Sequence, residues 1–232
     1  MKEIKEFVIG SFLANSEGYL KMRNLLGLMF EVSFAQAEKI EDKKLMEDKR
    51  WIVYSWDIKL DEEIKAGDKI EIATFSVGMK KFYAYRNFTI KKEGRIIGLA
   101  YCVFLLFDLK KLRPIKVPKS LEEAYQSEEA IYLGENLEYS EDFEKEEKIY
   151  IRKNDLDGNY HVNNAAYMDI IREISDIKDQ DIGYLKIVYK NEIRKKDYVI
   201  GKSVKKESEE DFKLVNDQGK SYSYGKIVKR NV

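Results

Sequence analysis

The chain has 232 residues, enough for one sizeable core or two small ones, and its 42 basic residues balance 42 acidic residues. A formal charge of zero argues against a nucleic-acid-binding protein and against electrostatic binding to an anionic membrane. One cysteine and one histidine exclude an internal disulfide and the usual zinc set of four nitrogen or sulfur ligands, so we expect a reducing compartment, no metal and no cofactor.

The first half of the chain predicts a helix followed by strands. The opening 18 residues contain a first strand, and residues 20–38 carry apolar side chains at helical spacing, which predicts a helix mostly surrounded by protein. Stretches rich in β-branched and aromatic residues follow at 51–60, 68–78, 82–92 and 95–109. The order indicates an α+β unit whose curved antiparallel sheet wraps the helix.

The second half repeats this order. A charged segment, 120–147, predicts a solvated linker or a frayed helix. A strand at 148–157 and a helix from 162–164 to about 175 follow it, and then come strands at 184–193, 197–206, 212–217 and 221–230. We therefore expect two similar domains, at 1–125 and 147–232, joined by a linker at 126–146.

The single histidine, His161, lies in the polar stretch NDLDGNYHVNNAAYMDIIRE (154–173), for which we considered three interpretations. The first is a turn that leads into a helix N-cap. The second, an EF-hand calcium loop, fails because Tyr160 and Ala166 occupy the glycine and glutamate positions. The third is a catalytic site, since the alternating Asp157, Asn159 and His161 would share one face of an extended segment beside a helix N-terminus that can stabilise an oxyanion.

The segment 155–164, D-L-D-G-N-Y-H-V-N-N, followed by Tyr167 and Glu173, resembles the signature of acyl-acyl carrier protein (acyl-ACP) thioesterases, best known from plant plastids. The resemblance extends to W-I-V at 51–53, A-G-D at 66–68 and Y-R-N-F at 85–88. It implies a double hotdog fold, in which two curved antiparallel sheets each wrap a central helix. It also implies release of free fatty acid from acyl-ACP, which would terminate fatty acid synthesis.

The resemblance implies four catalytic residues, namely Asp157, Asn159 and His161 with Glu192 in the next strand. Many plant members have a cysteine directly after that glutamate, where this chain has Ile193, so a cysteine nucleophile is excluded there. We expect Glu192, or Asp157 through a shared network, to activate water while Asn159, His161 and a backbone N–H hold the oxyanion. A variant makes Asp157 the nucleophile through a transient anhydride.

The resemblance places the acyl chain in the N-terminal half, and core packing is the competing interpretation for each apolar residue there. The candidate lining residues are Met22, Leu25, Leu26, Met29, Phe30, Tyr83, Tyr85 and Phe88.

Two basic clusters are candidates for docking the acidic acyl carrier protein, or they are ordinary solvated surface. They are Lys110, Lys111, Arg113, Lys116 and Lys119, and Arg194, Lys195 and Lys196. The alternatives to acyl-ACP hydrolysis are an acyl-CoA thioesterase of the hotdog type and a non-catalytic acyl-binding regulator. No plastid-type transit sequence precedes the first strand, which favours a bacterial cytoplasmic enzyme. The sequence is compatible with a homodimer.

Overall fold

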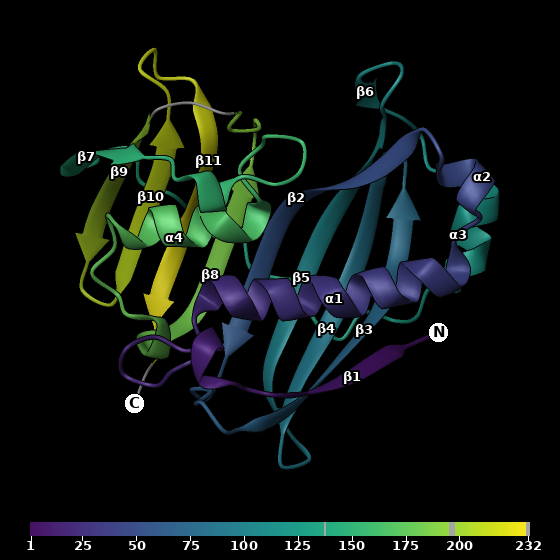
Figure 1. The fold of residues 1–232 in the computed structure, drawn as a ribbon, viewed down its shortest axis with the longest axis horizontal. Helices are drawn as coiled ribbons and strands as arrows, with labels where there is room; N and C mark the ends of the chain where they lie inside the picture. Colours follow the sequence, from purple (N-terminus) through teal and green to yellow (C-terminus); the bar gives the residue numbers. More distant parts are fainter. Residues whose placement is uncertain (137, 195–197, 231–232) are drawn as a thin grey trace.

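The computed structural model of the protein describes residues 1–136, 138–194 and 198–230. Within them, eleven strands form one continuous antiparallel sheet in the order β1-β3-β4-β5-β2-β8-β11-β10-β9-β7, with β6 paired to β5 (Figure 1). The N-terminal half supplies β1 (Glu3–Val8), β2 (Lys49–Leu60), β3 (Lys69–Lys80), β4 (Tyr83–Lys92), β5 (Arg95–Asp108) and β6 (Arg113–Pro114). The C-terminal half supplies β7 (Lys145–Tyr150), β8 (Ile182–Tyr189), β9 (Tyr198–Lys206), β10 (Glu209–Val215) and β11 (Ser221–Lys229).

One helix covers one face of the sheet in each half. The long helix α1 (Met22–Ile40) lies across the N-terminal strands, and the short helix α4 (Tyr167–Arg172) lies on the C-terminal strands (Figure 1). The buried side of α1 repeats at helical spacing, with Met22, Leu25, Leu26, Met29 and Val32 all at most 2% exposed. The predicted α+β arrangement, a curved sheet and its helix occurring twice, is confirmed. No helix in the described ranges is long and apolar enough to cross a membrane.

The two halves join edge to edge where β2 pairs with β8, in a register from Ser55↔Val188 to Lys59↔Tyr184. The described residues also form two short helices, α2 (Lys43–Met46) and α3 (Lys119–Tyr125). They form 3₁₀ turns at Ser11–Leu13, Lys153–Asp155, Asn164–Ala166 and Asp179–Asp181.

Three predicted elements have different boundaries in the structure. The strand predicted at 148–157 ends at Tyr150, and a 3₁₀ turn follows it. The helix predicted to reach about 175 is the 3₁₀ turn Asn164–Ala166 and then α4, which ends at Arg172. The strand predicted at 184–193 is β8, which ends at Tyr189, so Glu192 lies in a loop. The strand predicted at 148–157 ends early because the side chains of Asp155, Asp157 and Asn163 bond to nearby backbone groups instead of leaving them for a strand ladder.

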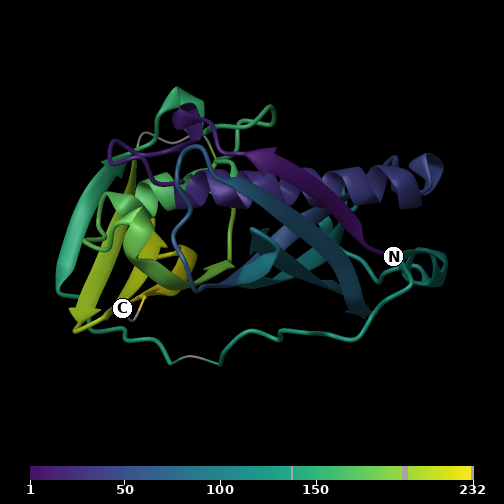
Figure 2. The same cartoon turned by 90° about the horizontal axis from the view of Figure 1, so that it is seen from below.

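The linker is packed more tightly than its charge predicts. The start of the charged segment 120–147 lies in α3, and residues 126–136 of the linker run along the face of the sheet opposite α1 (Figure 2). The fully buried Asn87 of β4 accepts backbone N–H bonds from Ile131 (2.9 Å) and Tyr132 (3.2 Å), and its amide donates to the Tyr132 carbonyl (2.6 Å). Asp57 of β2 accepts from the backbone N–H of Glu135 at 3.0 Å. The linker is therefore a strap across the sheet.

Candidate active site

The segment around Asp157 is a tight turn. The Asp157 N–H donates to the His161 carbonyl across the turn at 2.7 Å, and the Tyr160 N–H donates to the Asp157 carbonyl at 3.1 Å. The Asp157 carboxylate atom Oδ1 accepts from the backbone N–H groups of Asn159 (2.8 Å) and His161 (3.0 Å), and Tyr160 adopts a left-handed φ of 60°. The prediction that 157, 159 and 161 share one face of an extended segment is therefore wrong, whereas the turn interpretation is confirmed.

His161 and Glu192 are brought together from separate loops. The distance from His161 Nε2 to Glu192 Oε2 is 3.6 Å, and the side chains are 29% and 45% exposed. The backbones of the two segments pair directly. His161 and Arg194 form an isolated antiparallel β-bridge, and the Val162 N–H donates to the Ile193 carbonyl at 2.8 Å. Asn159 lies exposed at the tip of the turn. The imidazole and carboxylate thus sit side by side and reach solvent, which suits a proton-transfer pair.

Hydrogen bonds on both sides of Glu192 fix its loop. Before it, the backbone N–H of Lys190 donates to the Tyr222 carbonyl, and the side-chain amide of Asn191 donates to the Ser221 carbonyl, each at 2.8 Å. After it, the Ile193 N–H donates to the hydroxyl of Tyr167 on α4, at 3.1 Å. Tyr167 was quoted above only as part of the motif, and the structure assigns it a physical role: it holds the glutamate loop against α4.

Changing Tyr167 to phenylalanine should lower kcat about 3- to 10-fold with little change in KM, because the variant keeps the packed ring and releases two hydrogen bonds of the Glu192 loop, with the Ile193 N–H and the Asn191 carbonyl. Steady-state kinetics on one acyl substrate measures this split. Tyr150→Phe is the matched control, since Tyr150 is 65% exposed on β7. Equal kinetics in both variants would contradict the role of Tyr167.

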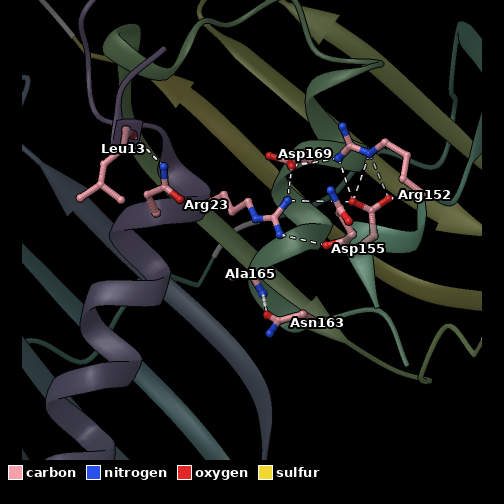
Figure 3. Close-up of polar contacts among 9 residues, drawn as sticks. Leu13, Arg23, Arg152, Asp155, Asn163, Ala165 and Asp169 are labelled. Carbon is pink, nitrogen blue, oxygen red and sulfur yellow. Dashed lines mark hydrogen bonds and ion pairs between the residues drawn. The ribbon is translucent and has the colours of Figure 1, made fainter. Parts of the chain in front are cut away.

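A charged cluster anchors the start of the turn (Figure 3). Asp155 is 1% exposed and binds Arg152 (Nη2 to Oδ1, 2.8 Å), while Arg152 also reaches Asp169 of α4 at 2.9 Å. Arg23, at the beginning of α1, hydrogen-bonds Asp169 and lies 3.9 Å from Asp155. The two carboxylates raise the pKa of Arg152 above its usual value. The cluster thereby ties the N-terminal helix to the segment that carries the turn at 157–161.

Asn163 connects this cluster to the following helix. Its N–H donates to the Asp155 carbonyl at 2.8 Å, and its side-chain oxygen caps the Ala165 N–H at 2.9 Å (Figure 3). Asn163 is therefore the N-cap of the 3₁₀ turn Asn164–Ala166. The sequence offered no sign of Arg23 or Arg152, because their carboxylate partners are set by tertiary structure.

The apolar candidates in the N-terminal half separate into two groups. Met22, Leu25, Leu26 and Met29 are packed into the main core, and Phe88 is fully buried there. Phe30 is only partly buried and contacts Trp56 (ring centroids 5.5 Å apart) and Phe34 (6.0 Å). Phe30 thus leads toward a small apolar pocket of about 40 Å³ beside the second half of α1. Its apolar border consists of Phe34, Ala37, Trp51, Met79, Ala84 and Phe104.

The rings of Tyr83 and Tyr85 lie on the other face of the sheet. Arg86 bonds to Gln36 of α1, so the alternating residues 83, 85 and 87 point away from that helix. The Tyr85 ring stacks on Tyr83 (6.3 Å) and on Tyr101 (6.0 Å). Tyr85 borders the pocket. The other residues that line it were not among the candidates named from the sequence.

Cys102 is fully buried on β5, and burial raises the pKa of its thiol well above the usual value. A buried thiol that stays protonated does not act as a nucleophile, because the reactive form is an accessible thiolate. Cys102 is therefore a core residue.

Two family profiles match nearly the whole chain, the acyl-ACP thioesterase N-terminal domain at residues 3–125 and the acyl-ACP thioesterase C-terminal domain at residues 138–229. The chain belongs to the acyl-ACP thioesterase family. Its tandem hotdog fold and its activity as a thioester hydrolase that releases fatty acid from acyl-ACP follow from that membership.

Solved structures share the fold of this acyl-ACP thioesterase over its full length. A putative oleoyl thioesterase from Lactobacillus plantarum is 18% identical, with 100% of this chain and 97% of the other covered and a TM-score of 0.85. An acyl-ACP thioesterase from Bacteroides thetaiotaomicron is 18% identical (98% and 97% covered, TM-score 0.84), and a 12:0-ACP thioesterase from Umbellularia californica is 17% identical (99% and 97%, TM-score 0.84). No curated protein sequence matches the chain.

Proposed function

We propose that this thioesterase hydrolyses acyl-ACP with water activated at the His161–Glu192 pair, and that the reaction ends fatty acid synthesis. The observation that carries the proposal is the 3.6 Å separation of His161 Nε2 and Glu192 Oε2 on two loops that are bonded to each other. That distance exceeds a good direct hydrogen bond and suits a shared water molecule.

In the proposed reaction Glu192 accepts a proton as the water oxygen attacks the thioester carbon. The amide of Asn159 and the imidazole of His161 donate to the oxygen that becomes negative. The tetrahedral intermediate then expels the thiolate, which leaves readily and takes the proton held by Glu192. The products are a free fatty acid and the thiol of the carrier, and the carboxylate of Glu192 is restored.

Asp157 is proposed as a positioning residue instead of a nucleophile. Its Oδ1 already accepts two backbone N–H bonds, which fold the turn and hold the oxygen away from an attack on carbon. A single turnover in ¹⁸O-labelled water distinguishes the routes, with the protein and the product analysed by mass spectrometry. We expect label in the fatty acid and none in the protein; label in the Asp157 carboxylate would establish the anhydride route.

We propose that the enzyme prefers acyl-ACP to acyl-CoA, because one of its two basic clusters docks the acidic carrier protein. In the first basic cluster, carboxylates pair with Lys110 (Asp48, 2.5 Å), Lys111 (Asp108, 3.8 Å) and Lys119 (Glu123, 3.5 Å). Arg113 and Lys116 are exposed and free of ion pairs within the described residues, and so they are the better docking candidates. In the second cluster, Lys195 and Lys196 lie outside the described residues, and Arg194 lies 3.9 Å from Glu192.

Reversing the charge of Arg113 and Lys116 together (R113E/K116E) should lower kcat/KM for acyl-ACP about 10-fold and leave acyl-CoA turnover unchanged, because these two side chains are proposed to contact the acidic surface of the carrier protein. Parallel assays on the two esters of one acyl chain, at low and high salt, measure the effect. Lys220→Glu, an exposed change in the C-terminal half, is the control. An equal loss on both esters would remove the docking role.

A non-catalytic acyl-binding regulator would bind acyl chains without turnover, and the intact polar pair argues against it. We further propose that residues 1–125 bind the acyl chain, that 126–146 link the halves and that 147–232 supply the catalytic groups. The cytoplasmic setting is proposed from the sequence alone.

A further inference from the structure

Lys190 is an exposed lysine at the seam between the two halves, and tyrosines surround it in place of carboxylates. It directly follows β8, which lies between β2 and β11 in the sheet (Figure 1). Its Nζ lies 3.4 Å from the hydroxyl of Tyr54 on β2 and 5.5 Å from the ring centre of Tyr224 on β11. Lys190, Tyr54 and Tyr224 form a seam trio that draws on both halves.

The ammonium of Lys190 forms no ion pair with a carboxylate among the described residues. Burial opposes its charge, but the hydroxyls of Tyr54 and Tyr224 outweigh that effect, so the pKa of Lys190 is raised. The contact with Tyr54 occupies one of the three N–H donors of the ammonium. A phenol that accepts from the ammonium still has its own O–H to donate, so the seam trio has several donors available for one anion.

The seam trio lies close to the proposed reaction centre. Lys190 precedes Glu192 by two residues, so their Cα atoms are at most about 7 Å apart. The Tyr54 ring contacts that of Tyr83 (5.8 Å between centroids), which places the seam trio on the sheet face opposite α1. Because the Glu192 loop begins at the end of β8, a molecule bound there can reach both faces of the sheet. A flexible pantetheine arm joins the thioester to its first phosphate in acyl-ACP and acyl-CoA alike.

Arg194 is the other cation of the segment 190–194, and its surroundings differ. It lies two residues after Glu192 with 77% of its side chain exposed, and its Nη2 is 3.9 Å from Glu192 Oε2. That carboxylate offsets part of its charge, whereas nothing of opposite charge pairs with Lys190 in the described part of the chain. Lys190 is therefore the better partner for a phosphate.

We infer that Lys190, with the hydroxyls of Tyr54 and Tyr224, binds the phosphate of the pantetheine arm that carries the acyl group. The inference rests on the proposed function and assigns a site to the carrier side of its substrate. Lys190 supplies the charge, and the two phenols donate hydrogen bonds. The phosphate takes no part in the reaction, so the seam trio positions the thioester and does not touch the reacting atoms.

The test compares two esters of one acyl chain, acyl-pantetheine and acyl-4′-phosphopantetheine, which differ only in the phosphate. The wild type should show a kcat/KM about 10-fold higher for the phosphorylated ester, because only that ester gains charge-assisted hydrogen bonds. Lys190→Gln should bring this ratio close to unity, and Lys190→Arg should keep most of it. Tyr54→Phe combined with Tyr224→Phe should lower the ratio about 3-fold. Arg194→Gln is the matched control and should keep the wild-type ratio.

A wild-type ratio close to unity, or a wild-type ratio in Lys190→Gln, would overturn the inference. An equal loss on both esters would also overturn it, since it would show an effect on the Glu192 loop alone. Loss of the ratio in Arg194→Gln but not in Lys190→Gln would place the phosphate at Arg194. A loss in Lys190→Gln that appears only with acyl-CoA would assign a nucleotide phosphate to the seam trio and overturn the inference as well.

A wild-type protein that hydrolyses no ester contradicts the proposed function instead. The phosphate site is then judged by calorimetric titration of wild type and Lys190→Gln with 4′-phosphopantetheine and with pantetheine. We expect the wild type to bind the phosphorylated compound about 10-fold more tightly than pantetheine, and Lys190→Gln to bind the two alike. Equal affinities for the two compounds in the wild type would overturn the inference.

Discussion

Replacing His161 with alanine should lower kcat by about 10²- to 10³-fold, the range expected when a hydrogen-bond donor to the developing oxyanion is removed. His161 is the sole imidazole of the chain and lies 3.6 Å from the carboxylate proposed to activate water. KM should change little, because the acyl chain is proposed to bind in the other half. Steady-state hydrolysis of one acyl-ACP by wild type and variant measures both constants.

The control for this prediction is Tyr160→Asn in the same turn. Tyr160 is 68% exposed and has a φ of 60°, a conformation that asparagine tolerates. It should retain most of the wild-type kcat. A His161→Ala protein that is folded and as active as the control would show that the imidazole has no part in the reaction.

Replacing Asp57 with alanine should lower the free energy of unfolding by about 3–5 kcal/mol. Asp57 is 3% exposed on β2, at the junction of the halves, and accepts from the hydroxyls of Tyr132 and Tyr184 (the latter at 2.8 Å) and from the Glu135 N–H. Lys186 Nζ lies 3.3 Å away. Removal of the carboxylate leaves these donors without their acceptor and releases the strap from the sheet.

Urea unfolding followed by circular dichroism measures this loss. Asp61→Ala is the matched control: Asp61 is 59% exposed just past the end of β2, and its contact with Lys59 is 3.8 Å. It should change the free energy of unfolding by less than about 0.5 kcal/mol. An Asp57→Ala protein as stable as the control would contradict the role of the strap in joining the halves.

Patterns of neighbouring residues predicted much of the fold. The helix at 20–38 and the four strands after it were placed within about three residues, because each has a clear period of 3.6 or 2 and a buried face. The turn at 157–160 could not be placed in this way. Alternating Asp157, Asn159 and His161 fit a strand equally well, and the outcome depends on which backbone groups the Asp157 carboxylate binds.

Long-range partners account for the rest. Asp169 and Arg23 are 146 residues apart, and no local pattern indicates that α1 would be tied to the segment of the candidate site. Which face of β4 carries Tyr85 depends on strand register, which the sequence did not define. By contrast, the pairing of His161 with Glu192 was implied by the family resemblance, and the structure brings the two side chains to 3.6 Å.

The most direct test of the account is free fatty acid release by the purified full chain from acyl-ACP and acyl-CoA esters of graded length, with the product identified by mass spectrometry. We expect release of free fatty acid from acyl-ACP, a higher kcat/KM for acyl-ACP than for the matching acyl-CoA, and a sharp upper limit of chain length. Binding of acyl chains without release of fatty acid or thiol from any ester would contradict it.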